Sequence, residues 1–195
     1  MHNRIWKVTG LLFLPFLLYG CGGAPTIRYM NPTANFTYVK KVAILPFSNF
    51  SDDKFAAEKV RGAFTINLMT RNAFEILEQG EVSKVFGSVK EEGAGEGAAI
   101  IQIDKATIKQ LGGKLGVQAI IMGSVNDFSA SSGRVSDNLI SITVKMIDVD
   151  SGTILWQAAT SQSGSSLGRK LLGLEQIDMN VLTNRAVKKV LNTLF

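Results

Sequence analysis

The stretch Lys41-Val42-Ala43-Ile44-Leu45-Pro46-Phe47 decides the fold class of this chain of 195 residues. Its four consecutive aliphatic residues leave no polar face, which is typical of a strand that is buried on both sides in an α/β protein. Pro46 has no backbone N–H to donate to a neighbouring strand, so we expect the strand to end near this residue.

The residues that follow predict a helix and a second strand. Residues 48–53 form a cluster of turn and helix-capping residues. From residue 54 to about residue 71, apolar side chains recur every four positions, as on the buried face of an amphipathic helix. Residues 74–77 then have the composition of a short strand. A strand, a helix and a strand of these lengths favour a parallel pair with a right-handed crossover.

The middle of the chain predicts two helices and another buried strand. Residues 81–86 have the pattern of a short helix, and we expect the glycine-rich residues 87–102 to form a mobile loop. Asp104 is placed to cap a helix that ends at Gly116, since Asp accepts hydrogen bonds from first-turn N–H groups and Gly tolerates the left-handed C-terminal position. Residues 117–125 are apolar enough for a second buried strand.

The last third predicts an antiparallel meander and a closing helix. Apolar and polar residues alternate over 140–146, which indicates a strand with one wet face. Residues 150–153 have the composition of a hairpin turn, so we expect residues 154–158 to form an antiparallel strand beside that strand. We expect an amphipathic helix over about residues 175–194. We therefore expect a single α/β domain over residues 39–195. Its mixed sheet has a parallel β-α-β start and an antiparallel meander near the C-terminus, and it packs on helices.

The only cysteine of the chain, Cys21, follows a segment that has the features of a secretory signal peptide. Residues 1–20 combine a basic start, a short apolar run and small residues near the cut. A cysteine directly after such a cut resembles the lipobox of bacterial lipoproteins, in which the thiol is acylated and becomes the new amino terminus. The apolar run is shorter than the roughly 20 residues of a membrane-spanning helix. A free thiol or an intermolecular disulfide is the alternative for a lone cysteine.

The lipobox resemblance implies a compartment and an anchor. Gly22 stands where lipoproteins retained at the inner membrane usually have Asp, so the resemblance implies a lipid-anchored protein on the periplasmic face of the outer membrane. Residues 21–38 contain glycine, proline and polar residues without apolar periodicity, which predicts a short tether. We expect a membrane, through acylated Cys21, and other envelope proteins as partners.

Composition argues against several classes of function. The one histidine, His2, lies in the predicted signal, so the mature chain cannot form a Ser-His-Asp or Cys-His arrangement. We likewise expect no catalytic residues, no metal site of the usual His and Cys ligands and no cofactor. The net charge of the whole chain is only +5, without an arginine-rich stripe, so we expect no nucleic-acid partner.

A few motifs could still carry chemistry, and each has a simpler structural explanation. The glycines at 93–97 lack the preceding strand of a dinucleotide-binding loop, and Leu115 occupies the Ser or Thr position of a phosphate-binding loop. The acidic pairs Asp52/Asp53 and Asp148/Asp150 suit a glycan hydrolase or a metal site, but capping and turn formation explain them better. Trp156 suits a binding platform, although a half-buried sheet residue is commoner.

Four segments, in this order and spacing, together resemble the curli assembly/transport (CsgG-like) lipoprotein family and its relatives, the lipoprotein activators of penicillin-binding proteins. They are residues 41–51, 74–78, 115–125 and 147–156. The resemblance implies a non-enzymatic interaction or assembly component in envelope biogenesis or secretion. The alternative is a subunit of an oligomeric outer-membrane secretion pore, and formation of a homo-oligomer stays open.

The chain departs from both branches of this resemblance. Pore-forming members insert two hairpins through the membrane, and each spanning strand needs roughly 9–11 residues. The candidate spacers, residues 129–138 and 162–174, are too short for such hairpins, so pore formation is disfavoured. Activators usually carry a long proline-rich tether, and the short tether of this chain disfavours contact with a distant inner-membrane enzyme.

Overall fold

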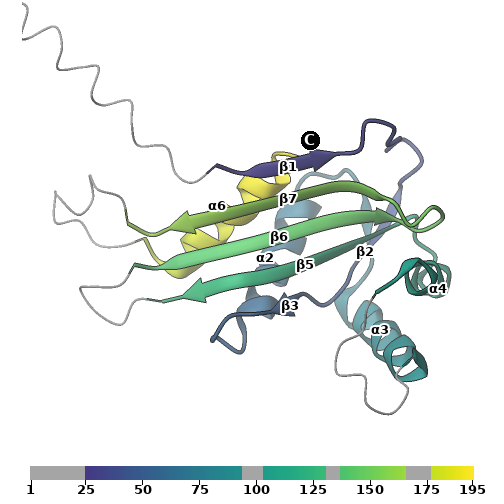
Figure 1. Cartoon of the computed structure of the whole chain (residues 1–195), viewed down its shortest axis with the longest axis horizontal. Helices are drawn as coiled ribbons and strands as arrows, with labels where there is room; N and C mark the ends of the chain where they lie inside the picture. The colour runs from purple at the N-terminus through teal and green to yellow at the C-terminus, as the bar shows by residue number, and fades with distance from the viewer. Residues whose placement is uncertain (1–24, 94–102, 131–136, 166–176) are drawn as a thin grey trace, which may run out of the picture.

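The computed structural model describes residues 25–93, 103–130, 137–165 and 177–195, which fold around one mixed sheet (Figure 1). The strands are β1 (Ile27–Met30), β2 (Lys41–Ile44), β3 (Ser48–Asn49), β4 (Glu75–Ile76), β5 (Ala119–Ser129), β6 (Leu139–Asp148) and β7 (Ile154–Ser163). The helices are α2 (Ala56–Met69), α3 (Gln79–Gly93), α4 (Lys105–Leu115) and α6 (Met179–Leu191). The strand order is β1-β7-β6-β5-β2-β4, and β3 pairs with β5 off this path.

The sheet has the predicted parallel start and antiparallel meander. β2 pairs in parallel with both β4 and β5, while β5, β6 and β7 follow one another antiparallel. Alternate residues of β2 are buried on opposite faces: Val42 and Ile44 belong to one hydrophobic cluster, and Ala43 belongs to the other. The α/β fold class is therefore confirmed, and so is the burial of this strand on both sides.

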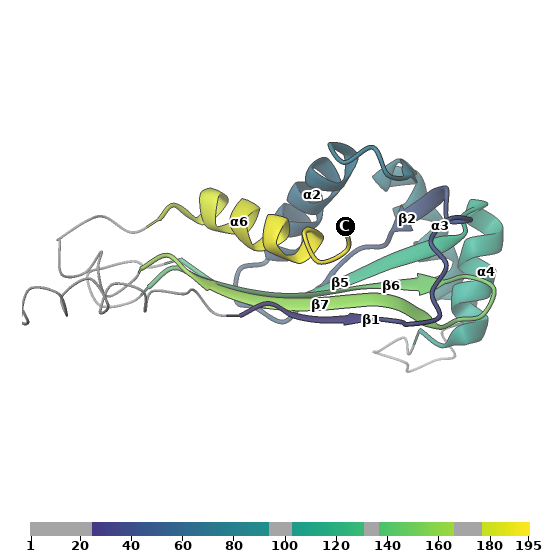
Figure 2. The same ribbon diagram turned by 90° about the horizontal axis from the view of Figure 1, so that it is seen from above.

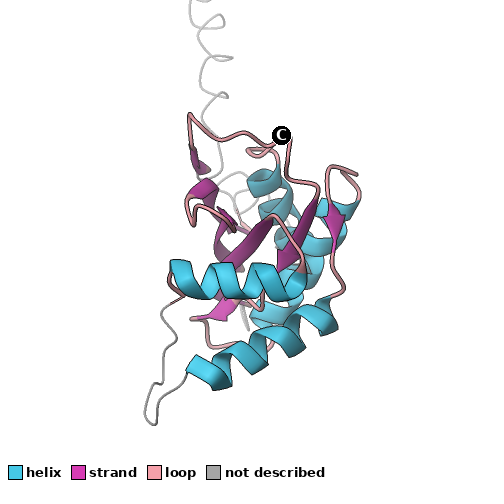
Figure 3. Ribbon diagram, turned by 90° about the vertical axis from the view of Figure 1, so that its right-hand side faces the viewer, coloured by secondary structure: helices cyan, strands magenta, loops and turns pink. Residues whose placement is uncertain are grey.

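The two faces of the sheet are covered to very different extents (Figure 2). α2 and α6 cover one face with the larger cluster, which includes the fully buried Phe64 and Trp156. α3 and α4 cover only one end of the other face, and Figure 3 looks onto that end. α4 approaches closely there because Gly112 has no side chain: a Cβ at this position would lie 2.3 Å from Val149 Cγ1.

Residues 27–30 differ from the expected tether, because they form the edge strand β1. Ile27 lies opposite Ala159 and Met30 opposite Trp156 in an antiparallel ladder with β7. All four side chains of β1 are exposed, so no buried alternation marks the strand in the sequence. The pairing adds a seventh strand to the sheet and brings the start of the described chain onto its edge.

Helix α3 is much longer than the short helix expected at residues 81–86. It continues to Gly93 through residues assigned to a mobile loop, and that part of the loop assignment is wrong. Val82 and Val89, two turns apart, are both buried against the smaller cluster. Glycines and charged residues between and after them hide this periodicity in the sequence.

The predicted caps of α4 are confirmed. Asp104 accepts a hydrogen bond from the Thr107 backbone N–H at 2.8 Å, and Gly116 adopts the left-handed conformation with φ 64°. The closing helix begins at Met179 after the N-cap Asp178, a few residues later than expected.

Several predictions fall on residues that the structure does not describe. These are the signal peptide, Cys21, the glycines after residue 93 and most of the two hairpin spacers. Within the described ranges, no helix is both long and apolar enough to cross a bilayer.

Candidate functional site

The acidic pair Asp52/Asp53 lies in the loop that leads from β3 into α2. Asp53 Oδ1 accepts a hydrogen bond from the Phe55 backbone N–H at 2.8 Å, and its Oδ2 pairs with Lys59 Nζ at 2.9 Å. The bond to Lys59 and then that to the Phe55 N–H lower the pKa of the carboxyl. Asp53 therefore fixes the turn before the helix, as the turn interpretation predicted, whereas the N-cap of α2 is Phe55 and has no side-chain cap bond.

The pair Asp148/Asp150 lies at the turn between β6 and β7. Asp148 Oδ1 accepts a hydrogen bond from Tyr38 OH at 2.5 Å, and Oδ2 accepts one from the Ser151 N–H at 2.7 Å. Burial acts to raise the pKa of Asp148, but the bonds from Ser151 and Tyr38 outweigh it and hold the pKa below its ordinary value. Asp148 fastens the turn to the segment before β2, while Asp150 stays exposed.

Side chains that could bind a metal ion are scattered over the part of the chain that the structure describes. No three His, Cys, Asp or Glu side chains there are grouped so as to hold a metal ion. Trp156 is fully buried and donates its indole N–H to Thr193 Oγ1 at 2.9 Å, so it belongs to the core and is no platform for a ligand.

Arg61 is a buried charge that sequence reasoning missed. Its guanidinium donates to the Ile44 carbonyl oxygen from Nε at 3.2 Å and from Nη2 at 2.6 Å, and Nη1 donates to Ser83 Oγ at 3.1 Å. Burial lowers its pKa. The side chain joins α2, α3 and the end of β2, so its role is structural. Its place beside Val60 on a helix gives no local signal of this role.

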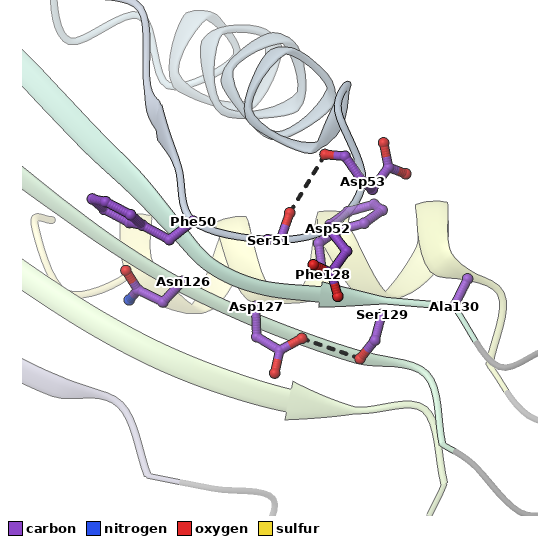
Figure 4. A pocket seen from close by; sticks show the side chains of 9 residues that line it. All are labelled: Phe50, Ser51, Asp52, Asp53, Asn126, Asp127, Phe128, Ser129 and Ala130. Carbon is purple, nitrogen blue, oxygen red and sulfur yellow. Dashed lines mark hydrogen bonds between the residues drawn. The ribbon is translucent and has the colours of Figure 1, made fainter. Parts of the chain in front are cut away.

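A cavity of about 470 Å³ lies between the loop before α2 and the end of β5 (Figure 4). It is lined by Phe50, Ser51, Asp52, Asp53, Asn126, Asp127, Phe128, Ser129 and Ala130. The sequence pointed to Asp52 and Asp53, but Asp127 is brought beside them only because β3 pairs with β5.

The walls of this cavity are held by their own contacts. Lys59 Nζ lies 5.4 Å from the centre of the Phe128 ring while it pairs with Asp53. Ser129 Oγ donates to Asp127 Oδ1 at 3.1 Å. The residues that line the cavity include no histidine, cysteine or lysine, and its polar groups are carboxylates, hydroxyls and an amide.

The second surface is the face of the sheet that faces away from α2 and α6. Ser141, Thr143 and Lys145 of β6 are half-buried on this face, while their neighbours along the strand are buried under the helices. A hollow of about 250 Å³ lies on it and is lined by Ser48, Met122, Gly123, Ser124, Thr143, Lys145 and Gln157. Hydroxyl, amide and ammonium groups thus line a shallow, polar surface.

The described residues thus form an α/β domain whose acidic pairs shape turns and whose sheet has one broad uncovered face. The chain belongs to the family described as "Peptidoglycan-synthase activator LpoB", whose family model matches residues 24–161. The family match therefore falls on the activator branch of the resemblance. A search of curated proteins found no match.

Solved structures share this fold at low sequence identity. The PelC dodecamer from Paraburkholderia phytofirmans is 14% identical, with a TM-score of 0.57, covering 86% of this chain and 96% of the PelC chain. Lipoprotein GNA1162 from Neisseria meningitidis is 20% identical, with a TM-score of 0.50, covering 78% of this chain and 99% of the other. These likenesses concern the fold alone.

Proposed function

We propose that this protein is a non-enzymatic lipoprotein of the outer membrane, on its periplasmic face, that activates a peptidoglycan synthase by direct contact. The observation that carries the proposal is the family match over residues 24–161. That stretch holds every strand of the sheet up to most of β7, together with α2, α3 and α4. A secretion pore is not proposed, since the matched family is named for activating a synthase.

The proposed anchor is acylated Cys21, and it would hold the domain close to the membrane. Ile27, the first residue of β1, is only six positions after Cys21. An extended chain spans at most about 3.6 Å per residue, so Ile27 lies within roughly 20 Å of the anchor. The synthase must therefore itself extend to the neighbourhood of the outer membrane to be reached.

The uncovered sheet face is the surface that we assign to the synthase. It is broad, contains few charges and is lined by hydrogen-bonding groups, as are the polar parts of reversible protein interfaces. Lys145 is its half-buried cation beside Thr143 and Gln157. A glutamate at this position reverses the charge at the centre of the surface, which costs affinity through an unpaired, partly desolvated carboxylate.

The test adds the purified protein to a purified peptidoglycan synthase from the same bacterium and measures the rate of glycan polymerisation from the lipid-linked precursor. We expect a higher rate with the protein and a weaker effect with Lys145→Glu. Lys109→Glu is the matched control, because Lys109 is exposed on α4. An unchanged rate together with no detectable binding would refute the proposal.

A second arm tests the enzymatic alternative. The protein alone is incubated with purified peptidoglycan, and release of glycan fragments is followed. We expect no release. A wall-degrading activity that disappears with Asp53→Asn or Asp148→Asn would instead establish a carboxylate-dependent hydrolase.

A further inference from the structure

The outer surface of α2 and α6 combines exposed apolar side chains from both helices. Ile66 and Met69 on α2 are 64% and 52% exposed, and Val181 on α6 is 47% exposed. The two helices lie side by side, and Asn67 Nδ2 donates to Asn184 Oδ1 across them at 3.0 Å (Figure 2). Apolar side chains that share one face of a helix pair are unlike single exposed residues, which need no explanation.

The same surface is basic. The exposed Glu58, in the first turn of α2, is the only acidic residue of the two helices. Arg71, Arg185 and Lys188 are exposed. Neither Arg185 nor Lys188 forms an ion pair with a described residue. Free cations beside exposed apolar groups are complementary to a surface that presents phosphates above hydrocarbon.

The end of this surface carries an aromatic group next to a guanidinium. Arg71 donates to Asn192 Oδ1, and its guanidinium carbon lies 5.6 Å from the centre of the Phe195 ring. Phe195 is 52% exposed and lies 6.1 Å from Phe74, centre to centre. Phenylalanine is one of the apolar residues that interfacial amphipathic helices bury at the membrane surface.

From these features we infer that the outer face of α2 and α6 rests on the surface of a bilayer that contains anionic phospholipid. Charge complementarity points to lipid headgroups as the occupant. The short reach from Cys21 supports the same occupant and rests on the proposed acylation, because a domain held within roughly 20 Å of the bilayer meets it at a high effective concentration. One acyl anchor plus a basic patch is the usual pair of signals for stable attachment.

A bilayer fits this face better than a protein partner does. The two cavities described above lie elsewhere, at the loop before α2 and on the opposite sheet face. A fluid bilayer needs no pocket of complementary shape on the outer sides of the two helices. The family match ends at residue 161, before α6, so the surface lies partly outside the part shared with the activator family. This arrangement leaves the uncovered sheet face turned towards the periplasm.

The test places a tryptophan on the surface and measures its depth in lipid. The full chain with Ile66→Trp is reconstituted in vesicles of phosphatidylethanolamine and bromine-labelled phosphatidylglycerol, and quenching of the indole by bromine is recorded. Trp6 is removed with the predicted signal peptide, and Trp156 is buried and contributes a constant background. The matched control is Ala106→Trp, an exposed position on α4.

We expect strong quenching at position 66, none above background at position 106, and loss of the signal in zwitterionic phosphatidylcholine vesicles that carry the same bromine label. Adding Arg185→Gln and Lys188→Gln removes two cations, which lowers the equilibrium constant for docking about 30-fold. Quenching that is absent at position 66, equal at both positions, or unchanged by this double substitution would overturn the inference. The inference would also be overturned if the tryptophan at position 66 became shielded only when the synthase was added, because the surface would then bind protein.

The double substitution also separates this inference from the proposed function. In detergent, without a bilayer, we expect Arg185→Gln/Lys188→Gln to stimulate the synthase as the unaltered protein does. Lost stimulation in detergent would overturn the membrane assignment of this face and would leave activation itself intact.

Discussion

Replacing Asp148 with Ala removes a carboxylate on which three donors converge. The residue is 5% exposed, and it accepts hydrogen bonds from Tyr38 OH, from the Ser151 N–H and from Ser151 Oγ. A hydrogen bond to a charged group contributes about 1.5–3 kcal/mol. Tyr38 and Ser151 are partly exposed, so in the variant their donor groups form hydrogen bonds with water instead. We therefore expect the free energy of unfolding to fall by about 2–3 kcal/mol, well below the sum of three bonds.

The measurement is thermal unfolding at neutral pH. For a domain of this size, about 1 kcal/mol lowers Tm by roughly 2–4 °C, so Asp148→Ala is expected to lower Tm by about 4–12 °C. Tyr38→Phe removes one of the three donors and is expected to cost about 1 kcal/mol. The control is Asp150→Ala, an exposed neighbour in the same turn, which is expected to change stability by less than about 0.5 kcal/mol.

The pH dependence of this effect follows from the direction of each pKa shift. The folded pKa of Asp148 lies below its ordinary value, so its contribution is complete above about pH 3.9 and disappears as the pH falls through the folded pKa. Burial and then the bond to Asp148 raise the pKa of Tyr38 to about 12. The contribution of Tyr38 is therefore complete below about pH 10 and is lost as the pH rises through its folded pKa.

The destabilisation by Asp148→Ala should thus be constant between those limits and shrink in acid. An unchanged Tm at neutral pH would refute the structural role, and a destabilisation that grows in acid would refute the sign of the pKa shift.

Three further predictions concern packing and the anchor. Gly112→Ala should destabilise by about 1–3 kcal/mol in denaturant unfolding, because its Cβ would collide with Val149, whereas Gly113→Ala has open space and should stabilise α4 by up to about 1 kcal/mol. Trp156→Ala should cost about 3–5 kcal/mol in the same assay, because it empties a fully buried site; a cost below about 1 kcal/mol would contradict the packing. The Cys21→Ser variant, exported behind an ordinary cleavable signal, should be released from membranes that are washed at high salt, and its unfolding transition should be unchanged. Retention of this variant on the washed membranes would contradict the proposed acyl anchor.

The parts of the fold that could be predicted are those with a strong local signal. The aliphatic run before Pro46 indicates a buried strand, and the four-residue spacing in α2 indicates a helix. Each signal is contained within a short stretch of sequence. The same is true of Asp104 and Gly116, whose caps act on neighbouring backbone groups. The turn-forming role of Asp53 was predictable for this reason too, because its carboxyl accepts a hydrogen bond from the backbone two residues later.

The parts that could not be predicted depend on partners far away along the chain. β1 is exposed on all four residues, and its pairing with β7 joins residues more than a hundred positions apart. The guanidinium of Arg61 donates hydrogen bonds to a carbonyl oxygen of β2 and a hydroxyl oxygen of α3. The spacing of residues around Arg61 in the sequence does not predict these acceptors. Asp127 reaches the cavity through the pairing of β3 with β5.

Sequence alone determined the class and order of most helices and strands, and it placed the one histidine, His2, within the predicted signal peptide. The tertiary structure alone decided which surfaces stay uncovered: the polar sheet face around Lys145, and the basic, apolar face of α2 and α6. The physical reason is that periodicity records whether a side chain is buried, whereas the neighbour that buries it, or leaves it exposed, is set by strand register and helix packing between distant segments.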